Sequence, residues 1–121
     1  APKETISDLL ASIFGYSFQT SYEQLQQSYQ YSCLATDTVE AAIIAFLHSK
    51  DFEDAIRKAI ALGGDAKTLA ATAGGIAEAF YPKVPKSLQK LGWDLLDEGQ
   101  QDLISEFRAE FVTELVPAQA A

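Results

Sequence analysis

The sequence of 121 residues has no methionine, one cysteine and one histidine. The single cysteine, Cys33, excludes a disulfide within the chain, and we expect it to be a buried thiol. Because the single histidine, His48, lies elsewhere in the pattern, the two residues do not predict a Cys–His nucleophile. We expect His48 to act as a cationic cap at a helix end. The missing methionine leaves two alternatives, a removed initiator or a chain that is a piece of a longer protein.

Basic residues are also scarce, with nine Lys and Arg against 17 Asp and Glu, for a net charge of −8. So acidic a chain lacks the clustered cations that bind a nucleic-acid backbone, and we expect no nucleic-acid partner. No apolar run approaches the roughly 18 residues of a membrane span, and no signal-peptide pattern opens the chain. We therefore expect a soluble protein without a membrane span, in a compartment that the sequence leaves unknown.

Hydrophobic residues make up 48% of the chain and charged residues 21%, an ordinary globular composition. The length is typical of one domain, so we predict a single domain over residues 1–121 with a disordered tail at 116–121. Apolar residues recur with helical period in nearly every segment. The predicted fold class is all-α, a compact bundle of about five helices.

The predicted helices are bounded by glycines, prolines and capping residues. Longer helices are expected to end at Gly15, to begin at the caps Asp37, Asp51 and Asp65, and to span about residues 100–115. Short helices are expected within 22–27 and 86–90, the first inside an otherwise irregular segment over 16–35. Asp37 and Glu40 fit a capping box. In the last helix we expect four apolar residues to face inward: Leu103, Ile104, Phe107 and Phe111.

The stretch GGDAKTLAATAGG, residues 63–75, predicts a turn followed by a helix. Gly64, Asp65 and Thr68 bring together a flexible backbone, a carboxylate and a hydroxyl at a helix start with free N–H groups. Such a start suits a phosphate or a hard cation such as Mg²⁺, although capping alone explains Asp65 about as well. Lys67 is unexpected, because the positive end of the helix dipole favours acidic residues in the first turn.

The longer stretch FEDAIRKAIALGGDAKTLAATAGGIAEAFY closely resembles the signature near the end of the ADP-ribosylglycohydrolase family, also called the dinitrogenase-reductase-activating or crystallin J1-like family. The segments SYQYSCLATDTVEAAIIAFLHS and VPKSLQKLGWDLLDEGQQDLISEFRAEF resemble the flanking parts in the same order, so the resemblance covers about Ile6 to Val112. It implies an all-α fold of which this chain is the C-terminal part. In active members it implies two Mg²⁺ ions, sometimes Mn²⁺, that position ADP-ribose and a water.

The resemblance also implies where the metal ligands fall. In the family's Asp-x-Asp-Thr motif the first Asp matches Asp65, the Thr matches Thr68, and the second Asp position holds Lys67. The N-terminal Thr-Asp-Asp-type motif has no counterpart in this chain. A lysine has no acceptor atom and cannot ligate a cation. We hypothesise that Lys67 fills the metal position and pairs with Asp65; the alternative is an exposed Lys67 without contacts.

These observations predict a catalytically inactive fragment of the family that acts as a structural or interaction subunit, without catalytic residues or a cofactor. Gly64, Asp65 and Thr68 would form a vestigial ADP-ribose or Mg²⁺ site, with Asp65 and Thr68 as the retained metal ligands and Lys67 disrupting it. Two alternatives are the C-terminal part of a split or processed Mg²⁺-dependent hydrolase and a metal-independent ADP-ribose-binding regulator. We expect a protein partner or self-association through an uncovered apolar face, for which the candidates are Phe14, Phe46, Ile76, Phe80 and Trp93.

Overall fold

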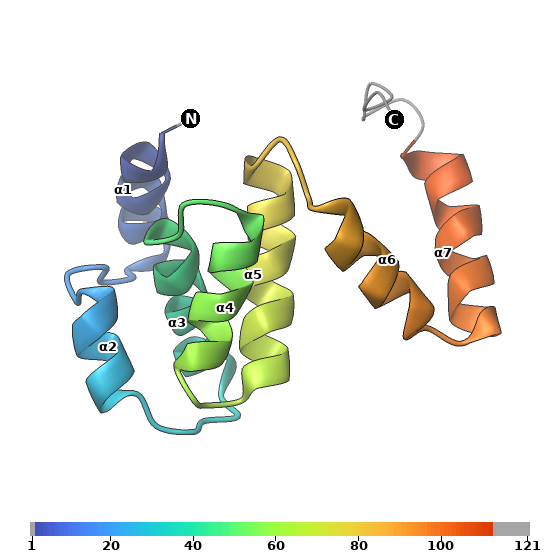
Figure 1. Ribbon diagram of the computed structural model, residues 1–121. Coiled ribbons are helices and arrows are strands. Elements are labelled where there is room, and N and C mark those ends of the chain that lie inside the picture. The colour runs from blue at the N-terminus through green and yellow to red at the C-terminus, as the bar shows by residue number, and fades with distance from the viewer. Residues whose placement is uncertain (1, 113–121) are drawn as a thin grey trace. The chain divides into compact units, whose positions relative to one another are not determined.

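The computed structural model describes residues 2–112, and every regular element within them is a helix (Figure 1). The seven helices are α1 (Lys3–Phe14), α2 (Tyr22–Ser28), α3 (Ala35–Leu47), α4 (Phe52–Ala61), α5 (Ala66–Phe80), α6 (Lys86–Asp94) and α7 (Glu98–Phe111). The all-α class is therefore confirmed, with α2 and α6 as the short helices among longer ones. The predicted tail at 116–121 and the last residues of the predicted final helix lie outside the described residues. No described helix has the length and apolar character needed to cross a membrane.

The chain forms two compact units, Ala1–Val84 and Pro85–Ala121. The boundary lies between two prolines, Pro82 and Pro85, whose rings are incompatible with a continuous helix through this segment. The expectation of one domain over residues 1–121 stays a prediction, because two packing units can belong to one domain.

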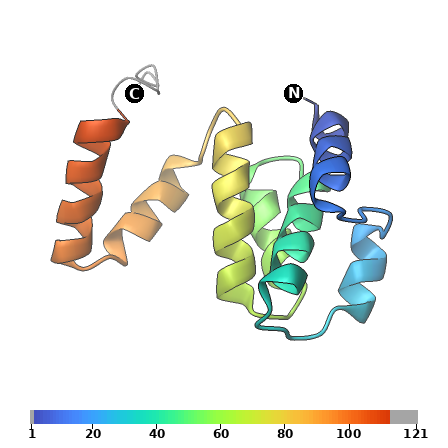
Figure 2. The same ribbon diagram turned by 180° about the vertical axis from the view of Figure 1, so that it is seen from behind.

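The core of the first unit lies between α3, α4 and α5, which run side by side in both views (Figures 1 and 2). Its largest fully buried side chains are Phe46 and Leu69. Around them alanines bring the helices close together, and six are fully buried: Ala42, Ala45, Ala55, Ala59, Ala73 and Ala77. Gly74 belongs to the same contact, because a Cβ added there would lie 3.5 Å from the Ile56 Cδ1 atom of α4. The small-residue face of α5 thus serves helix packing.

Aspartate side chains cap several helices, at Asp51 and Asp65 as the sequence predicts and at Asp97, which the sequence analysis did not identify. Asp51 accepts a hydrogen bond from the Asp54 backbone N–H at 2.8 Å, and Asp97 forms a capping box with Gln100 at the start of α7. The cap predicted at Asp37 is wrong, because α3 begins earlier, after Leu34, without a side-chain cap. The Asp37 carboxylate lies in the first turn and accepts a hydrogen bond from the Ser32 hydroxyl at 2.6 Å. The Asp37 carboxylate is therefore bonded to Ser32, outside the helix, and does not cap α3.

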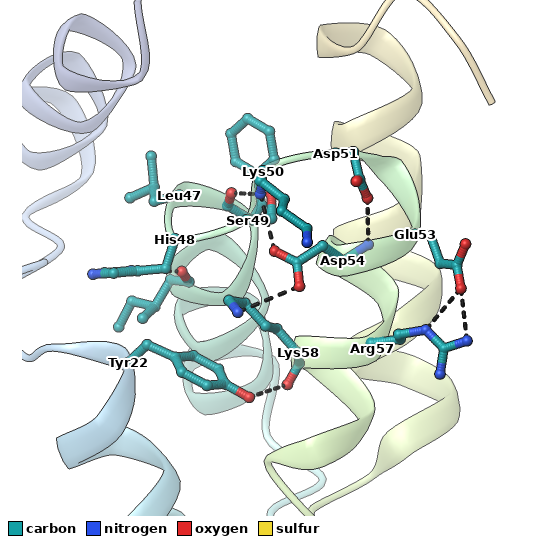
Figure 3. A network of polar contacts seen from close by, with 12 residues as sticks. Tyr22, Leu47, His48, Ser49, Lys50, Asp51, Glu53, Asp54, Arg57 and Lys58 are labelled. Atoms are coloured by element: carbon teal, nitrogen blue, oxygen red, sulfur yellow. Dashed lines mark hydrogen bonds and ion pairs between the residues drawn. The ribbon is translucent and has the colours of Figure 1, made fainter. Parts of the chain in front are cut away.

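A polar network joins α2 to α4 (Figure 3). The buried Tyr22 donates its hydroxyl to the Lys58 carbonyl at 2.8 Å, and the Lys58 ammonium lies 3.4 Å from the Asp54 carboxylate. The same carboxylate accepts the Lys50 backbone N–H at 3.0 Å. Burial acts to raise the pKa of Asp54, but the bonds from Lys50 and Lys58 outweigh it and hold that pKa below its usual value of 3.8.

The helix α1 has no buried residue, yet Lys3 at its start makes a dense set of contacts with the end of α3. Its ammonium donates to the Phe46 carbonyl at 2.8 Å, the Tyr81 hydroxyl at 2.7 Å and the Ser49 carbonyl. The ring of Phe46 lies 4.8 Å from the same nitrogen. A cation at a helix C-terminus meets unpaired carbonyls and the negative end of the dipole. Lys3 therefore anchors α1 to the core, and the sequence analysis did not predict this contact.

The buried stripe predicted for the last helix is wrong. No residue of α6 or α7 is buried, and Leu103, Phe107 and Phe111 are 67%, 57% and 60% exposed, with Ile104 only half-buried. Helical period identifies an apolar face but not whether anything covers it. Within this unit the Gln101 side-chain amide donates to the Trp93 carbonyl at 2.9 Å and links α7 to α6.

Two further burial predictions need correction. Cys33 is exposed, because it lies in the irregular connection between α2 and α3 and not on a helix face. Phe46 is fully buried and leaves the list of candidates for an uncovered face, whereas Phe14 is 65% exposed. Ile76, Phe80 and Trp93 are half-buried. His48 is the C-cap of α3, as predicted, and its ring Nδ1 lies 3.0 Å from the Ile44 carbonyl.

Candidate functional site

The start of α5 brings the predicted site residues Gly64, Asp65 and Thr68 together. Gly63 makes the turn in the left-handed region, with φ of 78°, and Asp65 follows as N-cap. The Asp65 carboxylate accepts the Thr68 hydroxyl at 2.8 Å with one oxygen and the Thr68 backbone N–H at 3.5 Å with the other. Both carboxylate oxygens therefore face Thr68, and capping accounts for their placement.

Lys67 is exposed and does not pair with Asp65. In the described part of the chain the ion pairs are Arg57–Glu53, Lys58–Asp54 and Lys90–Asp94. The hypothesis of a Lys67–Asp65 pair is therefore wrong, and the alternative of an exposed lysine holds. The reason is geometric, since side chains two positions apart on a helix do not face each other. The first turn of α5 consequently presents an ammonium group beside its free backbone N–H groups.

Gly64 lies under the ring of Tyr29, the C-cap residue of α2. A Cβ added at Gly64 would be 2.3 Å from the Tyr29 Cε1 atom, closer than real side chains approach. The Tyr29 hydroxyl is buried and has no hydrogen-bond partner among the described residues. Burial raises the pKa of Tyr29 above its usual value of 10.0, and the carboxylates of Asp37 and Asp65 raise it further.

Tyr29 also lines a groove of about 410 Å³ beside α2 and α3. Its lining residues are Thr20, Leu25, Ser28, Tyr29, Gln30, Asp37, Glu40, Ala41 and Ile44. The groove therefore meets the start of α5 at the Tyr29 ring. Its charged members, Asp37 and Glu40, are both acidic, so it suits a cationic or hydroxyl-rich group better than a phosphate. The sequence analysis interpreted these two residues as a capping box, although their spacing also places them on one helix face.

The residues at the start of α5 do not fit a Mg²⁺ site of their own. Mg²⁺ needs several oxygen ligands, whereas Lys67 offers none and Asp65 is already bonded to Thr68. Residues 2–112 contain no group of three or more His, Cys, Asp or Glu side chains that could hold a metal ion. Whether the chain binds a metal or cofactor stays a prediction, as does the binding role of Gly64, Asp65 and Thr68.

The glycine turn at Gly63, the N-cap Asp65 and the alanine-rich helix α5 together form the segment whose sequence resembles the ADP-ribosylglycohydrolase signature. Residues 3–114 match the sequence profile described as ADP-ribosylglycohydrolase. The chain belongs to the ADP-ribosylglycohydrolase family.

One curated relative is the ADP-ribosylarginine hydrolase Tri1 of Pseudomonas putida (strain GB-1), which is 38% identical over 78 residues. The match covers 62% of this chain and 20% of that protein, so the chain corresponds to about a fifth of its relative. No solved structure gives a significant match.

Proposed function

We propose that this chain is a catalytically inactive member of the family that acts as a structural or interaction subunit. The observation that carries the proposal is the start of α5, where Lys67 stands at a metal-ligand position of the signature. A unit charge 4 Å from another is worth about 1 kcal/mol even in water, so replacing a carboxylate by an ammonium opposes a divalent ion. The one remaining signature carboxylate, Asp65, is engaged by Thr68.

Exposed apolar side chains support the interaction part of this proposal. On α1, Leu9, Ile13 and Phe14 are 56%, 60% and 65% exposed, and Leu9 and Ile13, four residues apart, lie on one helix face. Large apolar side chains grouped on one face mark interaction surfaces more often than scattered ones do. A partner that covers such a face would stabilise the chain in proportion to the apolar area that it buries.

A second candidate function is the C-terminal part of a split or processed Mg²⁺-dependent hydrolase. The relative from P. putida is named a hydrolase, and this chain matches 20% of it, which favours a partner that supplies the remaining part. That reading requires Lys67 to be compatible with metal binding, which the charge argument opposes. A third candidate is a metal-independent ADP-ribose-binding regulator. The unpaired ammonium and free N–H groups at the start of α5 favour it, because both attract a pyrophosphate.

Calorimetric titration separates the regulator from the other two candidates. The full chain is titrated with MgCl₂ and then with ADP-ribose in the presence and absence of Mg²⁺. We expect no binding heat in any of these titrations. Binding of ADP-ribose without metal would replace the proposal by the regulator, and Mg²⁺-dependent binding or turnover would contradict inactivity.

Two lysine variants control the titration. Lys67→Asp restores the carboxylate of the signature, and Lys83→Asp makes the same charge change at an exposed site beyond the end of α5. If Lys67 blocks a metal position, only Lys67→Asp increases the affinity for Mg²⁺ or Mn²⁺. An equal increase in both variants would show that net charge alone is responsible.

A further inference from the structure

The helix α7 carries two parallel stripes of exposed side chains. Leu103, Phe107 and Phe111 repeat every four residues and are more than half exposed. Asp102, Glu106 and Glu110 each stand one position before them, repeat at the same interval and are exposed. Residues four apart lie one helical turn from each other, so an apolar stripe runs beside an acidic stripe along the helix.

No described side chain buries this surface, and a groove runs along it. None of the α7 residues is buried, and an isolated helix of this length is only marginally stable in water. The Phe107 and Phe111 ring centroids lie 5.0 Å apart, so the two rings form a continuous apolar edge. Among the described residues, this groove is lined by Leu103, Phe107 and Phe111 together with Glu106 and Glu110. A molecule bound in this groove would therefore contact both apolar and acidic side chains.

The negative charge of α7 determines which kind of molecule can bind this groove. Its 14 residues hold four carboxylates, at Glu98, Asp102, Glu106 and Glu110, and one cation, Arg108. The Arg108 guanidinium lies 5.9 Å from the Trp93 ring centroid, toward α6, and does not neutralise the acidic stripe. A second copy of the chain would place carboxylates against carboxylates, and a nucleic acid or an anionic lipid surface would be repelled in the same way.

We propose that α7 docks a basic amphipathic helix of a partner protein. Apolar side chains of that helix would cover Leu103, Phe107 and Phe111, and its Lys or Arg side chains would pair with Asp102, Glu106 and Glu110. The pairing follows the helix-in-groove mode, in which apolar anchors repeat with helical spacing and charges fix orientation and specificity. The inference rests on the proposed interaction role and names the chemistry of the partner.

Fluorescence anisotropy with three labelled synthetic peptides tests the proposal on the full chain. The probe is an 18-residue helix-forming peptide with Leu at four-residue intervals and Lys at the flanking positions. One control peptide replaces each Lys by Glu, and the other replaces each Leu by Ser. We expect the Leu–Lys peptide to bind at least tenfold more tightly than either control. Equal binding of the Ser–Lys peptide would overturn the proposal, because charge alone would explain it.

Protein variants then locate the binding surface. Phe107→Ser removes the central apolar side chain, and such central residues are commonly worth roughly tenfold or more in affinity. Phe14→Ser is the matched control, because Phe14 is similarly exposed on α1. We expect Phe107→Ser and Leu103→Ser to weaken the Leu–Lys peptide at least tenfold and Phe14→Ser to leave it unchanged, with helix content checked by circular dichroism. Equal weakening by Phe14→Ser would contradict the proposal.

Charge variants and sedimentation complete the test. Glu106→Gln combined with Glu110→Gln should weaken the Leu–Lys peptide and reduce its salt dependence, whereas Glu4→Gln combined with Asp8→Asn on α1 should do neither. Self-association at micromolar concentration that Phe107→Ser abolishes would replace the partner helix by a second copy. Failure of peptide binding leaves the Mg²⁺ and ADP-ribose titrations unaffected, so it overturns the docking proposal alone. Release of ADP-ribose would overturn the inactive role itself.

Discussion

Gly64→Ala tests the contact that joins the start of α5 to α2. Glycine is required at position 64 because the Tyr29 ring occupies the space of a side chain, with its Cε1 atom 2.3 Å from the place of an added Cβ. The backbone itself does not demand glycine, since the positive φ values are those of Gly15 and Gly63. The expected effect of the substitution is therefore steric.

The size of the effect follows from how far the ring must move. Ordinary van der Waals contact begins at 3.4 Å, so Tyr29 must shift by about an ångström or the α5 start must open. Tyr29 packs against the buried cluster around Ala41 and Ala45, which resists that shift. Overpacking of this kind costs about 1–3 kcal/mol. In a unit of this size each kcal/mol lowers the melting temperature by about 4–8 °C.

Thermal and urea unfolding of paired variants provide the assay. Gly75→Ala is the matched control, because Gly75 lies within α5 with nothing within 4 Å of an added Cβ. An alanine inside a helix should raise stability there by about 0.5–1 kcal/mol. Combining Gly64→Ala with Tyr29→Ala should remove most of the steric cost, which a double-mutant cycle measures. A Gly64→Ala variant as stable as the parent chain would refute the packing argument.

Three more predictions concern stability. Tyr29→Phe removes a buried hydroxyl that has no hydrogen-bond partner within residues 2–112, and it should raise the free energy of unfolding by about 1 kcal/mol. Tyr22→Phe loses the bond to the Lys58 carbonyl and should lower the free energy of unfolding by about as much; both are measured in urea. Lys3→Met removes charged hydrogen bonds to the end of α3, so it should lower the free energy of unfolding by about 2 kcal/mol and speed amide hydrogen exchange in α1. The control is Lys83→Met at an exposed position. An exchange rate in α1 no faster than in this control would contradict the anchoring role of Lys3. Because the folded pKa of Asp54 lies below 3.8, its contribution to stability is present above that pH and is lost as the pH falls through the lower folded value. Asp54→Asn should therefore be destabilising at pH 7 and flatten the acid limb of the stability curve, and an acid limb that matches the parent chain would exclude Asp54 as its cause.

The parts of the fold set by local interactions could be predicted from the sequence. The caps at Asp51 and Asp65 and the helix over Ala66–Phe80 depend on residues three or four positions apart, which sequence patterns contain. The predicted start of α3 is wrong because the Asp37 carboxylate accepts a hydrogen bond from Ser32, outside the helix, instead of capping it. A cap at Asp37 and a bond to Ser32 both involve residues close in sequence, so the sequence pattern does not distinguish them. The absence of a Lys67–Asp65 ion pair could also have been inferred from the sequence, because residues two positions apart on a helix do not share a face.

The remaining features depend on contacts between distant residues. Lys3 meets Phe46, 43 positions away, and no local pattern indicates that partner. The Tyr29 ring over Gly64 and the groove beside it likewise require the packing of α2 near α5. The apolar stripe of α7 was identified correctly as a stripe but wrongly as buried, because coverage is decided by tertiary contacts.

The central claim is that a chain with Lys67 at a metal-ligand position is catalytically inactive. The most direct measurement is the release of ADP-ribose from ADP-ribosylarginine by the full chain in the presence of Mg²⁺, followed by chromatography. The account predicts release no faster than in buffer alone. Mg²⁺-dependent release that Asp65→Asn abolishes would contradict it.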